Sequence, residues 1–241
     1  MITSKVRTVT VTSPPETLPT ARELSAVARK FFSDAPFIRR TLMHLRPYIC
    51  PFENLIAQVP RGARVLDIGC GSGLLLCFLA TRDPTIRGLG VDVSGPAIQM
   101  AKDMVRKIAE DSGRTPTVEF QVLDATGELP VGAFDVVILT DVLHHIPVAA
   151  QRDSVLKAAR LVGPGGTLLY KDMCSRPAWR AFANRLHDLL VARQWIHYVP
   201  IQHVESWVGE TGLTLTTAEN LCRYWYGHEL RVFARTPRAA I

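Results

Sequence analysis

The chain has 241 residues, of which 47% are hydrophobic, and its formal net charge is +6. This length and apolar content predict one folded domain with a sizeable core, and they exclude a disordered chain. The five cysteines are odd in number and form no C-x-x-C pair, which argues against a disulfide framework and a zinc site and favours a reducing, cytoplasmic location.

The N-terminal part of the chain carries most of the excess positive charge. Residues 1–48 hold eight Lys or Arg against three acids. We expect residues 1–20 to form a flexible tail without a signal sequence and residues 21–58 to form short helices, because apolar residues recur there at helical spacing. These helices are interpreted as a basic lid over the site. The alternatives are a solvated face packed on the core and a peripheral contact with an anionic substrate or lipid surface.

A predicted strand at residues 63–69 runs into a glycine loop. Glycines at alternate positions allow positive φ values and let main-chain N–H groups approach a ligand closely. The pattern is G-x-G-x-G, whereas dinucleotide folds use G-x-G-x-x-G and seat a pyrophosphate on a helix N-terminus. The preceding Asp67 would repel a pyrophosphate and attract an ammonium group. The loop residues are Gly69, Cys70, Gly71 and Gly73.

The next two predicted strands are each followed or ended by an acid. The strand at residues 86–92 ends in Asp92, about 20 residues after the glycines, where a carboxylate can accept hydrogen bonds from both ribose hydroxyls. The strand at residues 117–123 precedes Asp124. Between them Ser94 is expected to cap a helix with one apolar face. This alternation of strands and helices predicts a parallel sheet.

The fourth predicted strand, residues 134–140, leads into a segment with three titratable groups. Asp141 lies at its leaving end and is expected to face the cofactor. His144 and His145 follow, and an imidazole with a pKa near neutrality can take a proton from an acceptor. The alternative for both histidines is packing or cofactor contact.

The order of these motifs resembles the class I S-adenosylmethionine-dependent methyltransferases, in the small-molecule branch that includes ubiquinone and menaquinone biosynthesis enzymes. The segments that carry the resemblance are VLDIGCGSG, Asp92, VLDA at 122–125, FDVVILTDVLHHIP at 134–147 and LVGPGGTLLY at 161–170.

The resemblance implies an α/β fold with a Rossmann-like, doubly wound, seven-stranded sheet that is mostly parallel with an antiparallel last strand. It places the methyltransferase domain at residues 59–241, names S-adenosyl-L-methionine as the cofactor, and gives Asp124 a hydrogen bond to the adenine amino group. The expected cofactor contacts are Asp67, Gly69, Cys70, Gly71, Gly73, Asp92, Val93, Asp124, Ala125 and Asp141.

The C-terminal part is expected to shape the acceptor pocket. After a fifth strand at 166–172, residues 176–198 are predicted to contain an inserted amphipathic helix, and residues 213–218 and 229–234 a closing antiparallel pair. A turn at Gly227 would present Tyr226 and His228 together as further candidate catalytic residues, and core packing is the alternative. Their rings suit an acceptor with an apolar body and a polar tip.

The predicted activity is O- or C-methylation of a small, hydrophobic or aromatic acceptor. The alternatives are an aminopropyl transferase, another user of the same pocket, and a non-catalytic cofactor-binding protein. Metal assistance by Asp141 and Asp172 is disfavoured because Met173 stands where the resembling catechol-type enzymes have Asn, so no metal is expected. Nucleic-acid targets are disfavoured because the signature motifs of base methylation are absent. The sequence does not indicate an oligomeric state.

Overall fold

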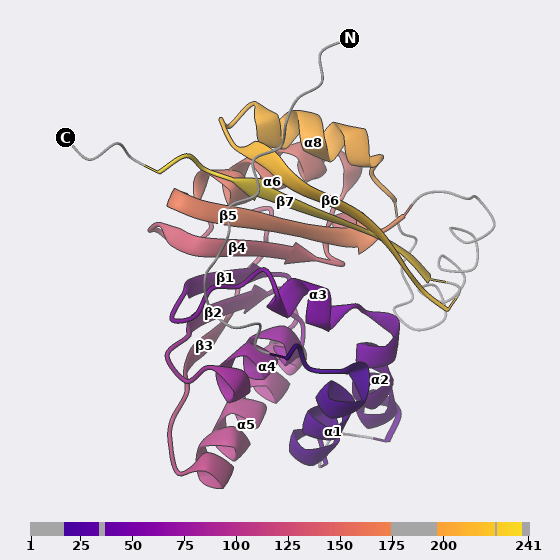
Figure 1. Ribbon diagram of the computed structural model, residues 1–241, viewed down its shortest axis with the longest axis vertical. Coiled ribbons are helices and arrows are strands. Elements are labelled where there is room, and N and C mark those ends of the chain that lie inside the picture. The colour runs from indigo at the N-terminus through magenta and orange to yellow at the C-terminus, as the bar shows by residue number, and fades with distance from the viewer. Residues whose placement is uncertain (1–16, 34–36, 175–196, 225, 238–241) are drawn as a thin grey trace.

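The sheet has seven strands in the order β3-β2-β1-β4-β5-β7-β6 (Figure 1). This computed structural model describes residues 17–33, 37–174, 197–224 and 226–237. All neighbouring strands pair in parallel except β7, which is antiparallel to both β5 and β6. The expected α/β fold, with its antiparallel last strand, is confirmed. The strands are β1 (Arg64–Ile68), β2 (Arg87–Asp92), β3 (Thr117–Val122), β4 (Phe134–Thr140), β5 (Val162–Met173), β6 (Thr214–Arg223) and β7 (Tyr226–Ala234).

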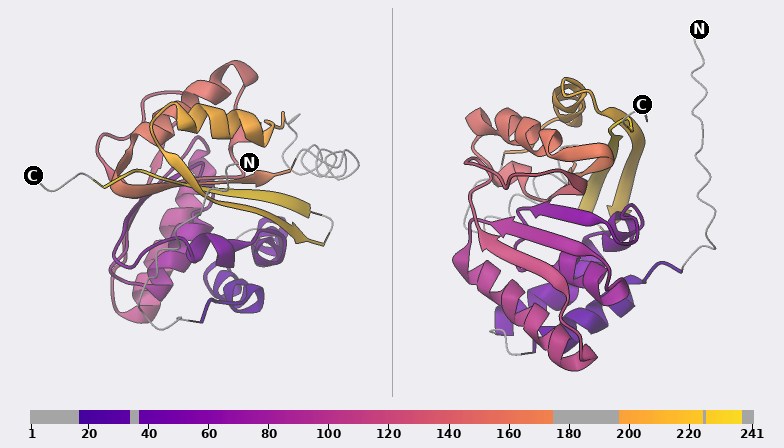
Figure 2. Two further views of the ribbon diagram at one scale, coloured as in Figure 1. Left: turned by 45° about the horizontal axis from the view of Figure 1, so that its top comes forward. Right: turned by 90° about the vertical axis from the view of Figure 1, so that its left-hand side faces the viewer.

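Helices cover both faces of the sheet (Figure 2). One layer consists of the first five helices and the other of α6 and α8, as the left view of Figure 2 shows. The helices are α1 (Ala21–Phe31), α2 (Phe37–Ile49), α3 (Phe52–Ile56), α4 (Leu74–Arg82), α5 (Gly95–Ser112), the 3-10 helix η1 (Leu143–His145), α6 (Val148–Arg160) and α8 (Ile201–Gly209).

The core is divided by the sheet into two apolar clusters. Side chains alternate along each strand, so in β1 Val65 joins the cluster under α1–α5, whereas Leu66 and Ile68 join the cluster under α6 and α8. We call the first side the α4 face and the second the α6 face. Helix α4 is buried from Leu74 to Ala80, as expected for a helix that is apolar all round.

The N-terminal helices are packed on the α4 face. Leu24 and Phe31 of α1 and Leu55 of α3 belong to its core cluster. Helix α1 begins with a capping box between Thr20 and Glu23, which satisfies main-chain donors of its first turn. These helices therefore contribute to the core, and their role as a lid stays a prediction. Most of the expected tail, residues 1–16, lies outside the described residues.

The C-terminal hairpin is longer than the sequence indicated. Strand β6 continues to Arg223 and pairs with Tyr226, so the turn lies at Tyr224, which has a φ of 56°. The predicted turn at Gly227 is wrong because Gly227 is inside β7. Tyr226 and His228 still share one face, since residues two apart in a strand point the same way.

The fifth strand also begins earlier than predicted, at Val162 rather than at residue 166. Its pairing with β4 is irregular between Phe134 and Val136, which accommodates the glycine-rich segment within the strand. The predicted inserted helix at 176–198 falls almost entirely on residues outside the described ranges. Residues 197–200 form no helix.

Candidate active site

The candidate site lies at the carboxyl ends of β1, β2 and β4. Strand β1 sits between β2 and β4, so the strand order reverses there. In open α/β sheets, ligands bind in the crevice at such a switch point. The structure brings the predicted glycine loop, Asp67, Asp92 and Asp141 to this edge, and Asp124 to the neighbouring end of β3.

The three glycines of the loop have different structural requirements. All have positive φ values, of 75° at Gly69, 55° at Gly71 and 72° at Gly73. A Cβ on Gly69 would come within 2.2 Å of Val142, and one on Gly73 within 2.4 Å of Phe120. At Gly71 nothing lies within 4 Å of that position. The loop is therefore close-packed at both ends and open at its centre.

Cys70 contributes its main chain to the loop. Its N–H donates to the carbonyl of Val91 at 3.1 Å, beside the 2.8 Å bond from Gly69 to the same oxygen. The thiol points inward, because a Cβ on Gly90 would come within 2.9 Å of the sulfur. Burial raises the pKa of the Cys70 thiol far above its usual range, and the nearby charge of Asp67 adds to this effect. The thiol is therefore un-ionised.

Asp92 connects the glycine loop to the end of β2. One carboxylate oxygen accepts from the N–H of Gly71 at 2.8 Å and the other from the N–H of Ser94 at 2.8 Å. Each carboxylate oxygen has a second lone pair, so both can still accept from a ligand. The next residue, Val93, is 70% exposed and offers an apolar surface at the same edge.

Asp124 and Ala125 follow β3 next to the end of β2. The N–H of Leu123 donates to the carbonyl of Asp92 at 2.9 Å, which joins the two strand ends. One Asp124 oxygen accepts from the N–H and the hydroxyl of Thr126, each at 2.8 Å. These bonds lower the pKa of Asp124. The carboxylate is exposed and ionised, and Ala125 is half-buried beside it.

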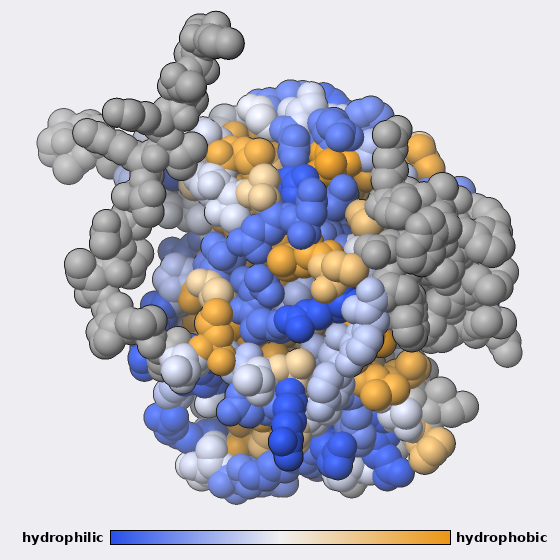
Figure 3. Space-filling view, turned by 45° about the vertical axis from the view of Figure 1, so that its right-hand side comes forward, coloured by the Kyte–Doolittle hydropathy of each residue, from blue (hydrophilic) through white to orange (hydrophobic). Residues whose placement is uncertain are grey.

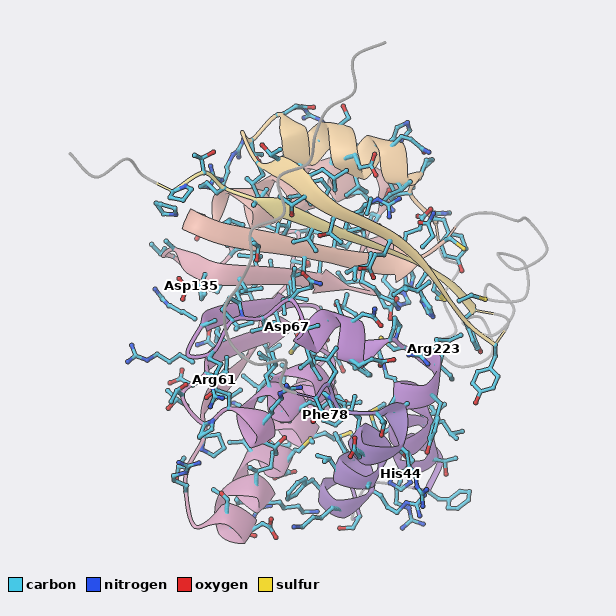
Figure 4. All side chains as sticks on the ribbon, viewed as in Figure 1. His44, Arg61, Asp67, Phe78, Asp135 and Arg223 are labelled. Carbon is cyan, nitrogen blue, oxygen red and sulfur yellow. The ribbon has the colours of Figure 1, made fainter. Side chains whose placement is uncertain are left out.

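Asp67 is a buried acid on the α4 face, and Figure 4 labels it beside the N-terminal helices. Only 3% of the residue is exposed. Burial and, to a smaller extent, the charge of Asp92 raise the pKa of Asp67, the guanidinium of Arg46 lowers it, and the net pKa is about 7. A cationic group bound beside Asp67 would relieve this unfavourable burial of charge.

Asp141 forms an ion pair that sequence reasoning missed. It has a φ of 51°, and the ammonium of Lys171 donates to its two oxygens at 2.7 and 2.8 Å. Arg46 of α2 lies 3.8 Å from the same carboxylate. Burial alone would raise the pKa of Asp141, but the charges of Lys171 and Arg46 outweigh it and hold the pKa well below its usual range.

Lys171 itself is almost completely buried, with 1% of the residue exposed. Burial disfavours its charge, but the charge of Asp141 prevails and raises the pKa of Lys171. A lysine within the apolar run of β5 was a signal in the sequence that something in the fold must neutralise it. The sequence did not reveal that the partner is Asp141.

His144 and His145 have different environments. His144 is buried on the α6 face, and its Nδ1 lies 2.5 Å from an oxygen of Asp172. The hydroxyl of Tyr170 lies 3.5 Å from the other oxygen of Asp172. The carbonyl of His144 accepts from the N–H of His197 at 3.1 Å. His145 is exposed. The His144 ring is thus held on the side of the sheet opposite Asp67.

Tyr226 and His228 lie on the α4 face, the same side as Lys171. Both residues are buried, and their rings are nearly parallel with centroids 6.5 Å apart. The Nε2 of His228 lies 2.8 Å from the carbonyl oxygen of Ile49. Burial and, after it, the charge of Lys171 lower the pKa of His228 to about 4, against the opposing charge of Asp141. His228 is therefore neutral near pH 7.

Around the site, the tip of the β6–β7 hairpin is tied to the N-terminal helices. Arg223, labelled in Figure 4, forms an ion pair with Glu53 of α3. On this side of the molecule apolar side chains form small separate groups among polar ones (Figure 3). Exposed apolar residues include Phe37, Leu45 and Tyr224.

Asp141 and Asp172, which were considered as metal ligands, have separate partners in Lys171 and His144. Within the described ranges, no group of three or more His, Cys, Asp or Glu side chains is placed to hold a metal ion. In the same part of the chain, no helix is both long enough and apolar enough to span a bilayer.

Comparison with known families decides the identity of the fold. The model of a methyltransferase domain family matches residues 39–218. The chain belongs to this family. The expected family and its cofactor, S-adenosylmethionine, are thus confirmed. The match covers the glycine loop, the acids at the strand ends and the Asp141–Lys171 pair, and it begins within α2.

The chain is similar to curated enzymes that methylate small molecules. A 27-O-demethylrifamycin SV methyltransferase of Amycolatopsis mediterranei is 32% identical over 71% of this chain and 62% of that protein. A ubiquinone biosynthesis O-methyltransferase of Alkalilimnicola ehrlichii is 29% identical over 66% of this chain and 64% of that protein. The chain thus spans less than two thirds of the length of these two relatives.

Solved structures show the same fold. An O-methyltransferase family protein from Burkholderia thailandensis has a TM-score of 0.65 at 24% identity, covering 86% of this chain and 62% of that one. The magnesium protoporphyrin IX methyltransferase of Synechocystis, solved with bound S-adenosylhomocysteine, has a TM-score of 0.64 at 19% identity, covering 88% of this chain and 94% of that one.

Proposed function

We propose that this protein transfers the methyl group of S-adenosylmethionine to a small apolar or aromatic acceptor. The observation that supports this most strongly is the pairing of an open glycine, Gly71, with two acids, Asp67 and Asp92, at the switch point of the sheet. Such a site offers close main-chain approach and acceptors for both a ribose and an ammonium group.

The residues present fit the cofactor at each of its ends. Asp92 would accept from the ribose hydroxyls through its remaining lone pairs, and Asp124 would accept from the adenine amino group beside Val93 and Ala125. Asp67 would face the ammonium group. Arg46, which reaches the same space from α2, would pair with the methionine carboxylate.

The bound cofactor supplies a methyl group on a positively charged sulfur. The chain's part is to align the acceptor with that methyl group and to exclude water. The α2–α3 segment, together with the hairpin that Arg223 ties to Glu53, would enclose the acceptor. In this proposal residues 21–58 act as the predicted lid and also contribute side chains to the core.

Among the candidate bases, His228 is favoured over His144. His228 shares the α4 face with Asp67 and Lys171, whereas the Nδ1 of His144 is engaged by Asp172 on the other face. Tyr226, parallel to His228, would contact the acceptor ring. The ring of His145 lies against that of His144, with centroids 4.2 Å apart, and its role as a base stays a prediction.

The acceptor is proposed to be methylated on oxygen. One relative is named as an O-methyltransferase and another as a methyltransferase of an O-demethyl compound. Both names support this choice. The aminopropyl transferase alternative requires an acidic site for a polyamine, and the cationic groups of Lys171 and Arg46 beside Asp141 would repel one.

A labelling experiment tests this function. The purified protein is incubated with S-adenosylmethionine carrying a deuterated methyl group and an extract of small metabolites, and products are found by their mass shift. We expect one labelled product of low molecular weight. Cofactor binding without any labelled product would favour the non-catalytic alternative, and absence of cofactor binding would refute the proposal.

A further inference from the structure

Three polar side chains form a row across β4, β5 and β7 on the α4 face. Thr140 of β4 is the register partner of Lys171 of β5, and His228 of β7 is the partner of Met173, two residues further along β5. Thr140 is 8% exposed, and Lys171 and His228 are each 1% exposed. The row lies under the α2–α3 segment, as the bond from His228 to Ile49 shows.

His228 presents an unused hydrogen-bond acceptor. A carbonyl oxygen only accepts, so the Nε2 that faces the oxygen of Ile49 must carry the ring proton. In a neutral imidazole the other nitrogen, Nδ1, then has a free lone pair. This Nδ1 is buried and has no hydrogen-bond partner among the described residues. The hydroxyl of Thr140 is likewise buried without a partner there.

One N–H group of Lys171 is not directed to Asp141. An ammonium group has three N–H donors, and two of them are directed to the oxygens of Asp141. The thiol of Cys50 is hydrogen-bonded to the same ammonium, but a thiol is only a weak acceptor, so a better acceptor can replace it. The buried Nδ1 of His228 has no partner in the described part of the chain, which is costly unless a bound group completes it.

A hydroxyl group matches this combination of donor and acceptor. Its hydrogen can be donated to Nδ1 of His228, and one lone pair can accept from Lys171. A second lone pair then remains to attack the methyl group. An amine nitrogen has a single lone pair, so accepting from Lys171 would prevent its attack, and a carboxylate has no hydrogen to donate to His228.

We propose that Lys171 and His228 bind the hydroxyl group of the acceptor, with Thr140 as a neighbouring contact, and that the acceptor is a phenol or a similar acidic alcohol. This assignment rests on the proposed methyl transfer. An oxygen lone pair forms the new O–C bond, the electrons of the broken C–S bond stay on sulfur, and the hydroxyl proton passes to Nδ1 of His228 and from there to water. Lys171 stabilises the developing negative charge on oxygen.

The test uses 4-nitrophenol as the probe, because its anion is yellow and its ionisation is read from absorbance. The full-length protein is saturated with S-adenosylhomocysteine, and binding of that cofactor product is first measured by calorimetry. The absorbance of bound 4-nitrophenol is then followed against pH. 4-Nitroanisole and 4-nitroaniline, which have a methyl ether and an amine in place of the hydroxyl, are the matched probes.

We expect the protein to lower the pKa of bound 4-nitrophenol by about one unit or more, as a cation within a few ångströms does. Lys171→Met should abolish this shift, and the exposed Lys102→Met is the matched control that should keep it. His228→Gln retains a donor for the Ile49 carbonyl but removes the Nδ1 acceptor, and it should weaken binding of un-ionised 4-nitrophenol, measured below the pKa of the probe, about five- to tenfold.

Lys171→Met leaves the Asp141 carboxylate buried without its ion pair and can unfold the protein, whereas His228→Gln and Thr140→Val introduce no unpaired charge. The proposal is overturned if 4-nitrophenol does not bind, if its bound pKa is unshifted, if folded Lys171→Met retains the shift, or if His228→Gln binds it as tightly as the wild type does. Equal binding of the three probes also overturns it. Failure to bind S-adenosylhomocysteine would instead refute the proposed function.

Discussion

The affinity for S-adenosylmethionine should depend on pH through Asp67. The folded protein holds the pKa of this acid at about 7, and the cofactor's ammonium group would bind the ionised form. Binding must therefore release a proton whenever Asp67 starts out protonated, and affinity must rise with pH. From a pKa of about 7, roughly one Asp67 in ten is ionised at pH 6 and about nine in ten at pH 8.

The cofactor's own α-amino group titrates at about pH 8, so the affinity is calculated for its ammonium form. The dissociation constant of that form should be about tenfold larger at pH 6 than at pH 8, which corresponds to about 1.4 kcal/mol. Other acids in the site do not interfere in this window, because the pKa values of Asp124 and Asp141 are lowered and that of His228 is about 4. Asp67→Asn should bind more weakly and should show no gain in affinity from pH 6 to 8.

Isothermal calorimetry in two buffers of different ionisation enthalpy measures both the affinity and the protons released. At pH 7 we expect about half a proton released per cofactor bound. A wild-type affinity that is flat from pH 6 to 8 would contradict the assignment of Asp67, as would the same pH slope in Asp67→Asn.

Four other substitutions separate cofactor contacts from packing. Asp92→Ala should lose about 1.5 to 3 kcal/mol of binding, or about 10- to 150-fold in affinity for S-adenosylmethionine; an unchanged affinity in a folded variant would remove Asp92 from the site. Gly69→Ala should lower the melting temperature because its Cβ would come within 2.2 Å of Val142. Gly71→Ala should mainly lower the affinity for S-adenosylmethionine. The reverse pattern would be inconsistent with the loop geometry. Arg46→Met should weaken S-adenosylmethionine about tenfold while leaving binding of adenosine unchanged, and equal losses for both ligands would show that Arg46 acts on the fold instead.

Much of the fold could be predicted because its signals are local. The glycines and acids at this edge lie at or just beyond strand ends, as Asp92 ends β2 and Asp124 lies two residues beyond β3, so short segments suffice to locate them. Parallel strands bring such ends to one edge. The alternation of these strands with helices was enough to predict that they pair in parallel.

The residues proposed to bind the acceptor could not be predicted in the same way, because their contacts join segments that are distant in the sequence. The hydrogen bond between His228 and Ile49 spans 179 residues, and the pairing of Asp141 with Lys171 depends on the register of β4 against β5. The hairpin boundary was also missed, since Glu219 and Asn220 disfavour strands by themselves, yet pairing with β7 keeps them in β6.

The ties between the last hairpin and the first helices have a consequence for how the protein is made. Ile49 and Glu53 are synthesised well before their partners His228 and Arg223. Segments near the N-terminus usually fold first during synthesis, but these contacts of the α2–α3 segment can form only after the β6–β7 hairpin has been synthesised. If the proposed function holds, a chain that stops before β6 would retain the glycine loop and the acids proposed for the cofactor but would lack His228, so it would compete for the methyl donor without using it.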